Sequence, residues 1–184
     1  MRLAALLVCL AACGGAGTKE PTTPTDPAGR AAPAAAVVAA GAPYSAADEA
    51  IGSIALAMAQ DRALEIAGSL PADAGKPELM EATGEWVFAA KYPDQGLTIM
   101  FGSTQEAGPF TVSGVAVEAP NTWPTPRGIS IGSAKADVER MYAGSINTEE
   151  PMENTVVVNS VYGGVLFGIT DDKVSSIFVG AAAE

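Results

Sequence analysis

The feature that most constrains the fold is a pattern of segments that occurs twice in residues 46–184. Each copy begins with an amphipathic stretch of helical spacing that ends at a glycine, and three apolar runs follow. The pattern predicts helices over 54–68 and 129–144, and strands over 86–92, 96–101, 112–117, 156–162, 164–169 and 174–179. We therefore expect an α+β fold of two tandem helix–strand–strand–strand repeats, 46–120 and 121–184. The helices should pack on one face of an antiparallel sheet.

Alternation along the predicted strands assigns side chains to two faces, because successive residues of a strand point in opposite directions. Six apolar residues fall on the face expected under the helices: Leu97, Ile99, Phe101, Val165, Phe167 and Ile169. Met100, Leu166 and Phe178 then lie on the other face. Because exposed apolar patches tend to mark contact sites, these three are candidate partner-binding residues. Alternatively, the linker, a loop or the curvature of the sheet covers them.

The N-terminus has the layout of an export signal. Arg2 precedes a short apolar run and small residues, and Leu10-Ala11-Ala12-Cys13 follows. This motif resembles the lipobox of bacterial lipoproteins, which implies removal of residues 1–12 and lipidation of Cys13. The acyl chains would anchor the protein in a membrane. The alternative is an ordinary signal peptide with an incidental cysteine.

Gly14 follows the lipobox cysteine. In bacteria with two membranes, the residue after the lipidated cysteine affects which membrane a lipoprotein reaches, and Gly14 resembles the default that leads to the outer membrane. This resemblance implies a lipid anchor in the outer membrane, with the protein facing the periplasm. In an organism with one membrane, the anchor would lie on the outer face of the plasma membrane. Residues 13–45 read as the lipidated cysteine and a flexible linker rich in Ala, Pro and Thr, a spacer between membrane and domain.

Composition excludes several classes of function. The chain contains no histidine and two cysteines, Cys9 and Cys13, so histidine-based triads and the usual zinc sites are excluded. The net charge is −11, which makes nucleic-acid binding improbable. No nucleotide or catalytic motif occurs, and we expect neither a cofactor nor an enzyme. Glu149, Glu150 and Glu153 crowd one loop with Asn147 and could hold Ca²⁺, but their spacing lacks an EF-hand pattern, so solvation is the preferred explanation.

The segment Gly128-Ile129-Ser130-Ile131-Gly132-Ser133 through Tyr142, with its counterpart in the first copy, carries a family resemblance. It resembles the tandem αβ modules of the beta-lactamase inhibitor protein and the SmpA/OmlA-type lipoproteins of the outer membrane. The resemblance implies a helix layer on an antiparallel sheet and binding of other proteins without catalysis. No contact residues carry over, and the inhibitor's disulfides have no counterpart among the cysteines of this chain.

These observations predict a membrane-anchored, non-catalytic protein-binding module of the cell envelope, whose partner is an envelope protein. A first alternative is a small-molecule or glycan-binding protein, whose pocket would be lined by Trp86, Tyr92, Trp123 or Tyr162. A second is a hydrolase that uses only carboxylates, which requires two Asp or Glu side chains facing each other in a cleft. Asp171 and Asp172 are adjacent, but they fall in a predicted tight turn.

Overall fold

The computed structural model describes residues 39–45, 48–149 and 151–181. The predicted signal peptide, Cys13 and most of the predicted linker lie outside these residues. The helices and strands are, in chain order, β1 (Ala50–Ile51), β2 (Ile54–Ala55), α1 (Gln60–Ala67), β3 (Glu78–Met80), β4 (Glu85–Tyr92), the 3-10 helix η2 (Pro93–Gln95), β5 (Leu97–Ser103), β6 (Thr111–Glu118), α2 (Lys135–Met141), β7 (Thr155–Ser160), β8 (Gly163–Thr170) and β9 (Lys173–Gly180).

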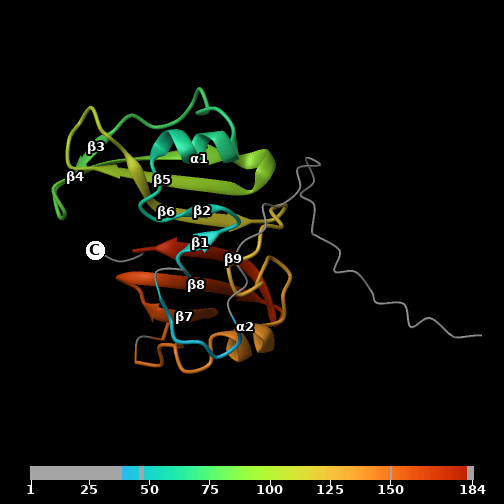
Figure 1. Cartoon of the computed structure of the whole chain (residues 1–184). Coiled ribbons are helices and arrows are strands. Elements are labelled where there is room, and N and C mark those ends of the chain that lie inside the picture. The colour runs from blue at the N-terminus through green and yellow to red at the C-terminus, as the bar shows by residue number, and fades with distance from the viewer. Residues whose placement is uncertain (1–38, 46–47, 150, 182–184) are drawn as a thin grey trace, which may run out of the picture.

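One antiparallel sheet of seven strands organises the molecule, in the order β3-β4-β5-β6-β9-β8-β7. Strands β6 and β9 pair at its centre, with Val115 opposite Val179. Figure 1 shows the strands stacked from β4 at one end to β7 at the other, with α1 and α2 near opposite ends of the stack. The strands of the two predicted repeats therefore belong to a single continuous sheet.

The predicted α+β class with helix-packed tandem repeats is wrong. The fold is mostly antiparallel β, with 40% strand and 14% helix. The two α-helices have only eight and seven residues, too short to form a layer over seven strands. The predicted helix starts are not helical, because Ile54–Ala55 pairs with Ala50–Ile51 as a hairpin and Gly132 has a φ of 86°. Apolar residues at these positions are buried by turns and a hairpin, which hydrophobic spacing does not distinguish from a helix.

The core lies between one face of the sheet and the short elements α1, α2 and the β1–β2 hairpin. Alternation places Leu97, Ile99 and Phe101 in this core, each at most 2% exposed. Val165 and Phe167 are fully buried in the second half of the sheet. The helices contribute mainly small side chains, Ala63, Ala67 and Val138. Most of the core is therefore formed by strands, each large buried side chain adding about 1.5–3 kcal/mol.

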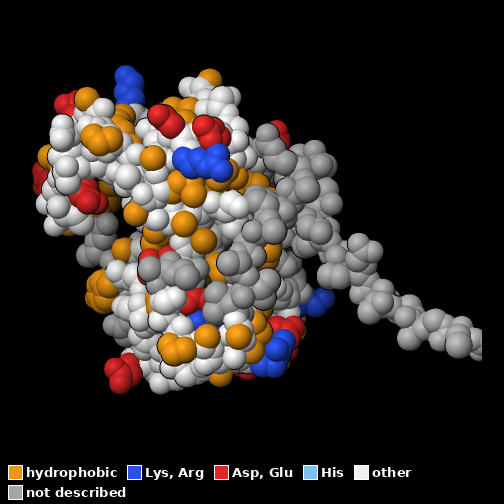
Figure 2. All heavy atoms as spheres, in the orientation of Figure 1, with side chains coloured by type: hydrophobic (Ala, Val, Ile, Leu, Met, Phe, Trp, Pro, Cys, Tyr) orange, Lys and Arg blue, Asp and Glu red, His pale blue; other side chains and the backbone are white. Residues whose placement is uncertain are grey.

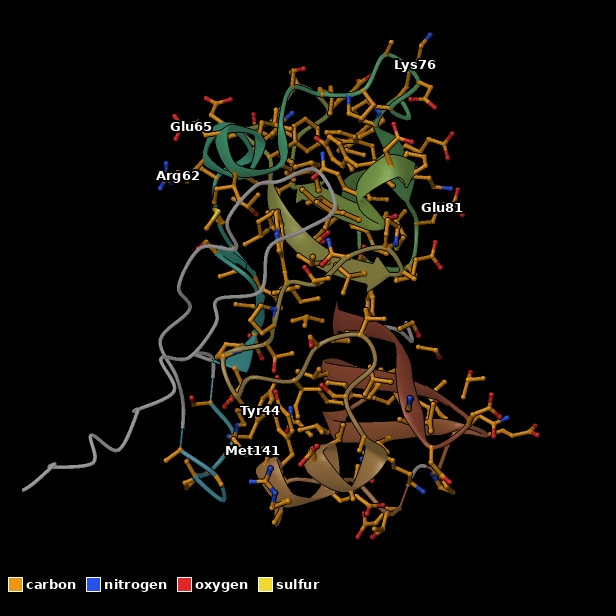
Figure 3. The ribbon with its side chains drawn as sticks, turned by 90° about the vertical axis from the view of Figure 1, so that its right-hand side faces the viewer. Tyr44, Arg62, Glu65, Lys76, Glu81 and Met141 are labelled. Atoms are coloured by element: carbon orange, nitrogen blue, oxygen red, sulfur yellow. The ribbon has the colours of Figure 1, made fainter. Side chains whose placement is uncertain are left out.

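The end of the predicted linker is bound to this body by Arg127. The guanidinium donates to the carbonyl oxygens of Ala42 and Pro43 at 2.8 and 3.1 Å, and to that of Met141 at 2.8 Å. The backbone N–H of Gly41 also donates to the Met141 carbonyl, at 3.3 Å. Figure 3 shows Tyr44 and Met141 close together on this side of the molecule. We call residues 39–45 the approach segment, and it is hydrogen-bonded to the folded body through two backbone carbonyls and one backbone N–H.

None of the helices in the described ranges is both long and apolar enough to cross a membrane.

Candidate functional site

The face of the sheet turned away from α1 and α2, called the open face here, carries the three predicted partner-binding residues. Met100 lies on β5, Leu166 on β8 and Phe178 on β9. Leu166 and Phe178 are directly opposite each other in the β8–β9 pair. All three line one hollow of about 630 Å³. The remaining lining residues are Met80, Met152, Thr155, Gly168, Ser176 and Ala181.

Two of these residues rest on glycines of the sheet. A β carbon placed on Gly114 would lie 3.1 Å from the sulfur of Met100 and 3.4 Å from the ring of Phe178. One placed on Gly180 would lie 3.2 Å from the same ring. The Phe178 ring therefore lies over the main chain of β6 and β9, where only glycine leaves room for it. Gly114 therefore lies next to both Met100 and Phe178.

The three side chains differ in how far they are covered. Leu166 is only 7% exposed, whereas Met100 and Phe178 are partly exposed. Leu166 is therefore largely buried and offers little surface to a partner. The surface that a partner could reach is formed chiefly by Met100, Phe178 and the other methionines.

Met80 and Met152 also line the hollow, and the sequence pattern predicted neither of them. Met80 ends the three-residue edge strand β3 and stands opposite Glu85 of β4. Met152 lies just before β7 and is 44% exposed. Neither residue belongs to an alternating run long enough to reveal its direction. The hollow thus presents three methionines from separate elements, and flexible thioethers adapt readily to a partner surface.

Carboxylates border the β3–β4 side of the open face. Glu85 is paired with Met80, and a β carbon on Gly102 would lie 3.5 Å from its Oε2 atom. Glu78 stands opposite Val87, which shares the direction of Glu85 along β4. Glu81 lies in the turn between β3 and β4 and points away from α1 in Figure 3. This border is therefore acidic next to an apolar hollow.

None of the four aromatic residues proposed to line a small-molecule or glycan pocket lines the hollow on the open face. Trp123 is 1% exposed, and a β carbon on Gly52 would lie 3.1 Å from its ring, so it belongs to the core. Tyr92 is 8% exposed and donates to the Gly68 carbonyl at 3.4 Å. Tyr162 is 66% exposed after β7. Trp86 lies on β4, opposite Ser103 of β5.

The acidic loop and the paired aspartates lie near α2. The backbone N–H of Glu149 donates to Asn147 Oδ1 at 2.9 Å, and position 150 is outside the described residues. Asp171 and Asp172 occupy the β8–β9 turn with φ of 50° and 57°. They border a second hollow of about 650 Å³. Across the described parts of the chain, no three His, Cys, Asp or Glu side chains gather where they could hold a metal ion.

This second hollow is larger than the one on the open face by a small margin, but its lining is more polar. Lys135 and Glu139 of α2 line it as a partly exposed pair at 3.7 Å. Solvated ion pairs of this kind contribute little energy and do not indicate a ligand. The apolar hollow is therefore the better candidate site.

Comparison with protein-family models, with curated proteins and with solved structures finds no match to this chain.

Proposed function

We propose that this protein is a lipid-anchored protein of the bacterial cell envelope that binds another protein without catalysis, through the open face. The anchor is Cys13, inferred from the lipobox pattern Leu10-Ala11-Ala12-Cys13. The observation that carries the proposal is the hollow of about 630 Å³ shared by Met100, Leu166 and Phe178.

The physical argument rests on apolar surface that folding leaves partly in water. Met100 and Phe178 are partly exposed, and Met152 is 44% exposed, around one hollow. Removing such surface from water contributes about 25 cal/mol per Å², so a partner that covers these side chains gains affinity. Apolar and aromatic anchors at the centre of an interface carry most of its energy. Phe178, held against glycines, is such an anchor in a fixed position.

A small apolar molecule is the second candidate occupant. The volume of the hollow, about 630 Å³, falls within the range of small-molecule sites. A glycan is disfavoured because none of the aromatic side chains proposed to contact it lines this hollow. Thr155 and Ser176 are the hydroxyl-bearing residues of the lining.

The test is partner capture by residues 14–184, the mature chain without its lipidated cysteine, so that the approach segment is retained. The variant Met80→Asp/Met100→Asp places charges in the hollow and avoids the more buried Leu166. A matched control, Leu70→Asp, places a charge on another exposed apolar residue, 41% exposed and outside the lining. We expect saturable retention of an envelope protein that the hollow variant loses and the control keeps. Equal retention by both variants would place binding elsewhere and contradict the proposed surface.

A further inference from the structure

The charges around the open face are arranged unevenly. Glu78, Glu81 and Glu85 gather at the β3–β4 turn, beside Met80. Lys91, at the other end of β4, is six residues from Glu85, roughly 20 Å along the strand. Among the described residues, none of these three carboxylates has a Lys or Arg within ion-pair distance. Lys76 precedes Glu78 by two residues but pairs with none of the three. Three carboxylates near one lysine leave this part of the open face with a net negative charge.

The helix side of the molecule is different. Arg62 and Glu65 pair on α1, and Asp137 and Arg140 pair on α2 at 2.7 Å. Figure 2 shows acidic and basic side chains together over α1. Charges on this side largely neutralise one another, so the acidic border of the hollow is a local feature as well as a consequence of the net charge of −11.

From this arrangement we propose that the occupant of the open face is a cationic amphipathic helix of a protein partner. Its apolar stripe would contact Met80, Met100 and Phe178, and a Lys or Arg at one end would lie over Glu78 and Glu85. This inference rests on the proposed function and specifies the partner's chemistry. Complementary charge at the border of an apolar surface increases the association rate and selects the partner.

A helix is favoured over an added strand by the position of the hollow. The main-chain groups of β5, β6, β9 and β8 already pair within the sheet, so a ligand on the face is bound by side chains. Strand addition needs a free sheet edge, whereas a helix presents its apolar side chains as one stripe. The hollow extends from Met80 on the edge strand β3 to Met152, next to the other edge strand β7.

The same charges argue against two other occupants. A second copy of the chain would bring a second set of carboxylates to the interface, and like charges across an interface are unfavourable. An anionic membrane surface is repelled by the acidic border for the same reason. Both occupants are distinguishable by experiment.

The experiment uses the mature chain and two synthetic helices of about 18 residues with the same Leu and Ala stripe. One probe carries Lys on its polar face and the other carries Glu. We expect saturable one-to-one binding of the Lys probe by isothermal titration calorimetry, and its loss in Met100→Asp. The variant Glu78→Gln/Glu85→Gln should bind the Lys probe about threefold to tenfold more weakly, with a smaller salt dependence.

The control Asp61→Asn/Glu139→Gln removes two exposed carboxylates from α1 and α2 and should bind the Lys probe as the wild type does. If the control weakens binding as much as the Glu78/Glu85 variant, only net charge matters and the inference is overturned. If both probes bind equally and Met100→Asp abolishes both, the surface stands but the cationic partner is overturned. If neither probe binds, a helical occupant is overturned. If the chain dimerises or binds anionic vesicles, and Met100→Asp disrupts that association, the occupant is a second copy or a membrane surface and the helix is overturned.

Discussion

The guanidinium of Arg127 donates two hydrogen bonds to the carboxylate of Asp48, a residue 79 positions away in the sequence, and both side chains are fully buried. The bond from Nη2 to Oδ2 measures 2.9 Å. The remaining N–H groups of the guanidinium donate to backbone carbonyls of the approach segment and of α2, so all five of its N–H groups are used. The guanidinium also lies 4.6 Å from the centre of the Tyr142 ring. One side chain thus joins the approach segment, α2 and the link between the two halves of the sheet.

Replacing Arg127 with methionine should strongly destabilise the fold. The substitution leaves Asp48 buried without its partner, and breaking a buried ion pair costs about 3–5 kcal/mol. The free energy of unfolding from urea denaturation measures this loss. The double variant Arg127→Met/Asp48→Asn should recover part of it, because the unpaired charge is gone. Arg62→Met, which removes an exposed arginine from α1, is the control and should cost less than about 1 kcal/mol. A small loss at Arg127 would contradict its role in the core.

The same ion pair predicts how stability depends on pH. Burial opposes the charged form of Asp48, but hydrogen bonds from Arg127 and Ser45 outweigh burial and lower the pKa of the carboxyl below its ordinary value of 3.8. A carboxyl whose pKa is lower in the folded state than in the unfolded state stabilises the fold at pH values above its pKa in the unfolded state. This stabilisation is lost as the pH falls through the pKa of the folded state. The difference in unfolding free energy between wild type and Asp48→Asn should be constant near neutral pH and shrink below about pH 4. A difference that grows on acidification would contradict a charged Asp48.

Gly114→Ala should alter the hollow more than the fold. The new β carbon would lie 3.1 Å from the sulfur of Met100, the flexible part of a long side chain, so a loss of less than about 1.5 kcal/mol is expected. Met100 and Phe178 would have to shift, and partner capture should weaken. Gly180→Ala is the contrast, because it meets the Ser113 carbonyl at 2.9 Å with a φ of 139° and should cost about 1–3 kcal/mol. Thermal and urea unfolding separate the two effects. Unchanged capture by Gly114→Ala would show that Met100 and Phe178 are not contacts.

Cys13→Ala tests the anchor. Without the thiol no acyl chain can be attached, so the variant should lose incorporation of radiolabelled palmitate. Cys9→Ala is the matched control, since Cys9 lies within the predicted signal peptide and should not affect labelling. Palmitate incorporation that persists in the Cys13 variant would refute the predicted lipobox.

Local alternation was enough to assign the two faces of the sheet. Ile99 and Phe101 are buried on the core face, while Met100 between them lines the hollow. Helix length was overestimated, because the apolar residues before α1 and α2 suit a hairpin or a turn as well as a helix. Met80 and Met152 were missed because the strand and loop that carry them have no periodicity to read.

The sequence by itself determined which neighbouring side chains of a predicted strand point in opposite directions, since a period of two follows from backbone geometry alone. The tertiary structure decided that β6 and β9 pair at the centre of one sheet, and that Arg127 finds Asp48. Such contacts join residues far apart in the chain, and their energies depend on burial and geometry that no short window contains. The methionine-lined hollow arises from the same cause, because its residues meet only when the strands that carry them are assembled into a sheet.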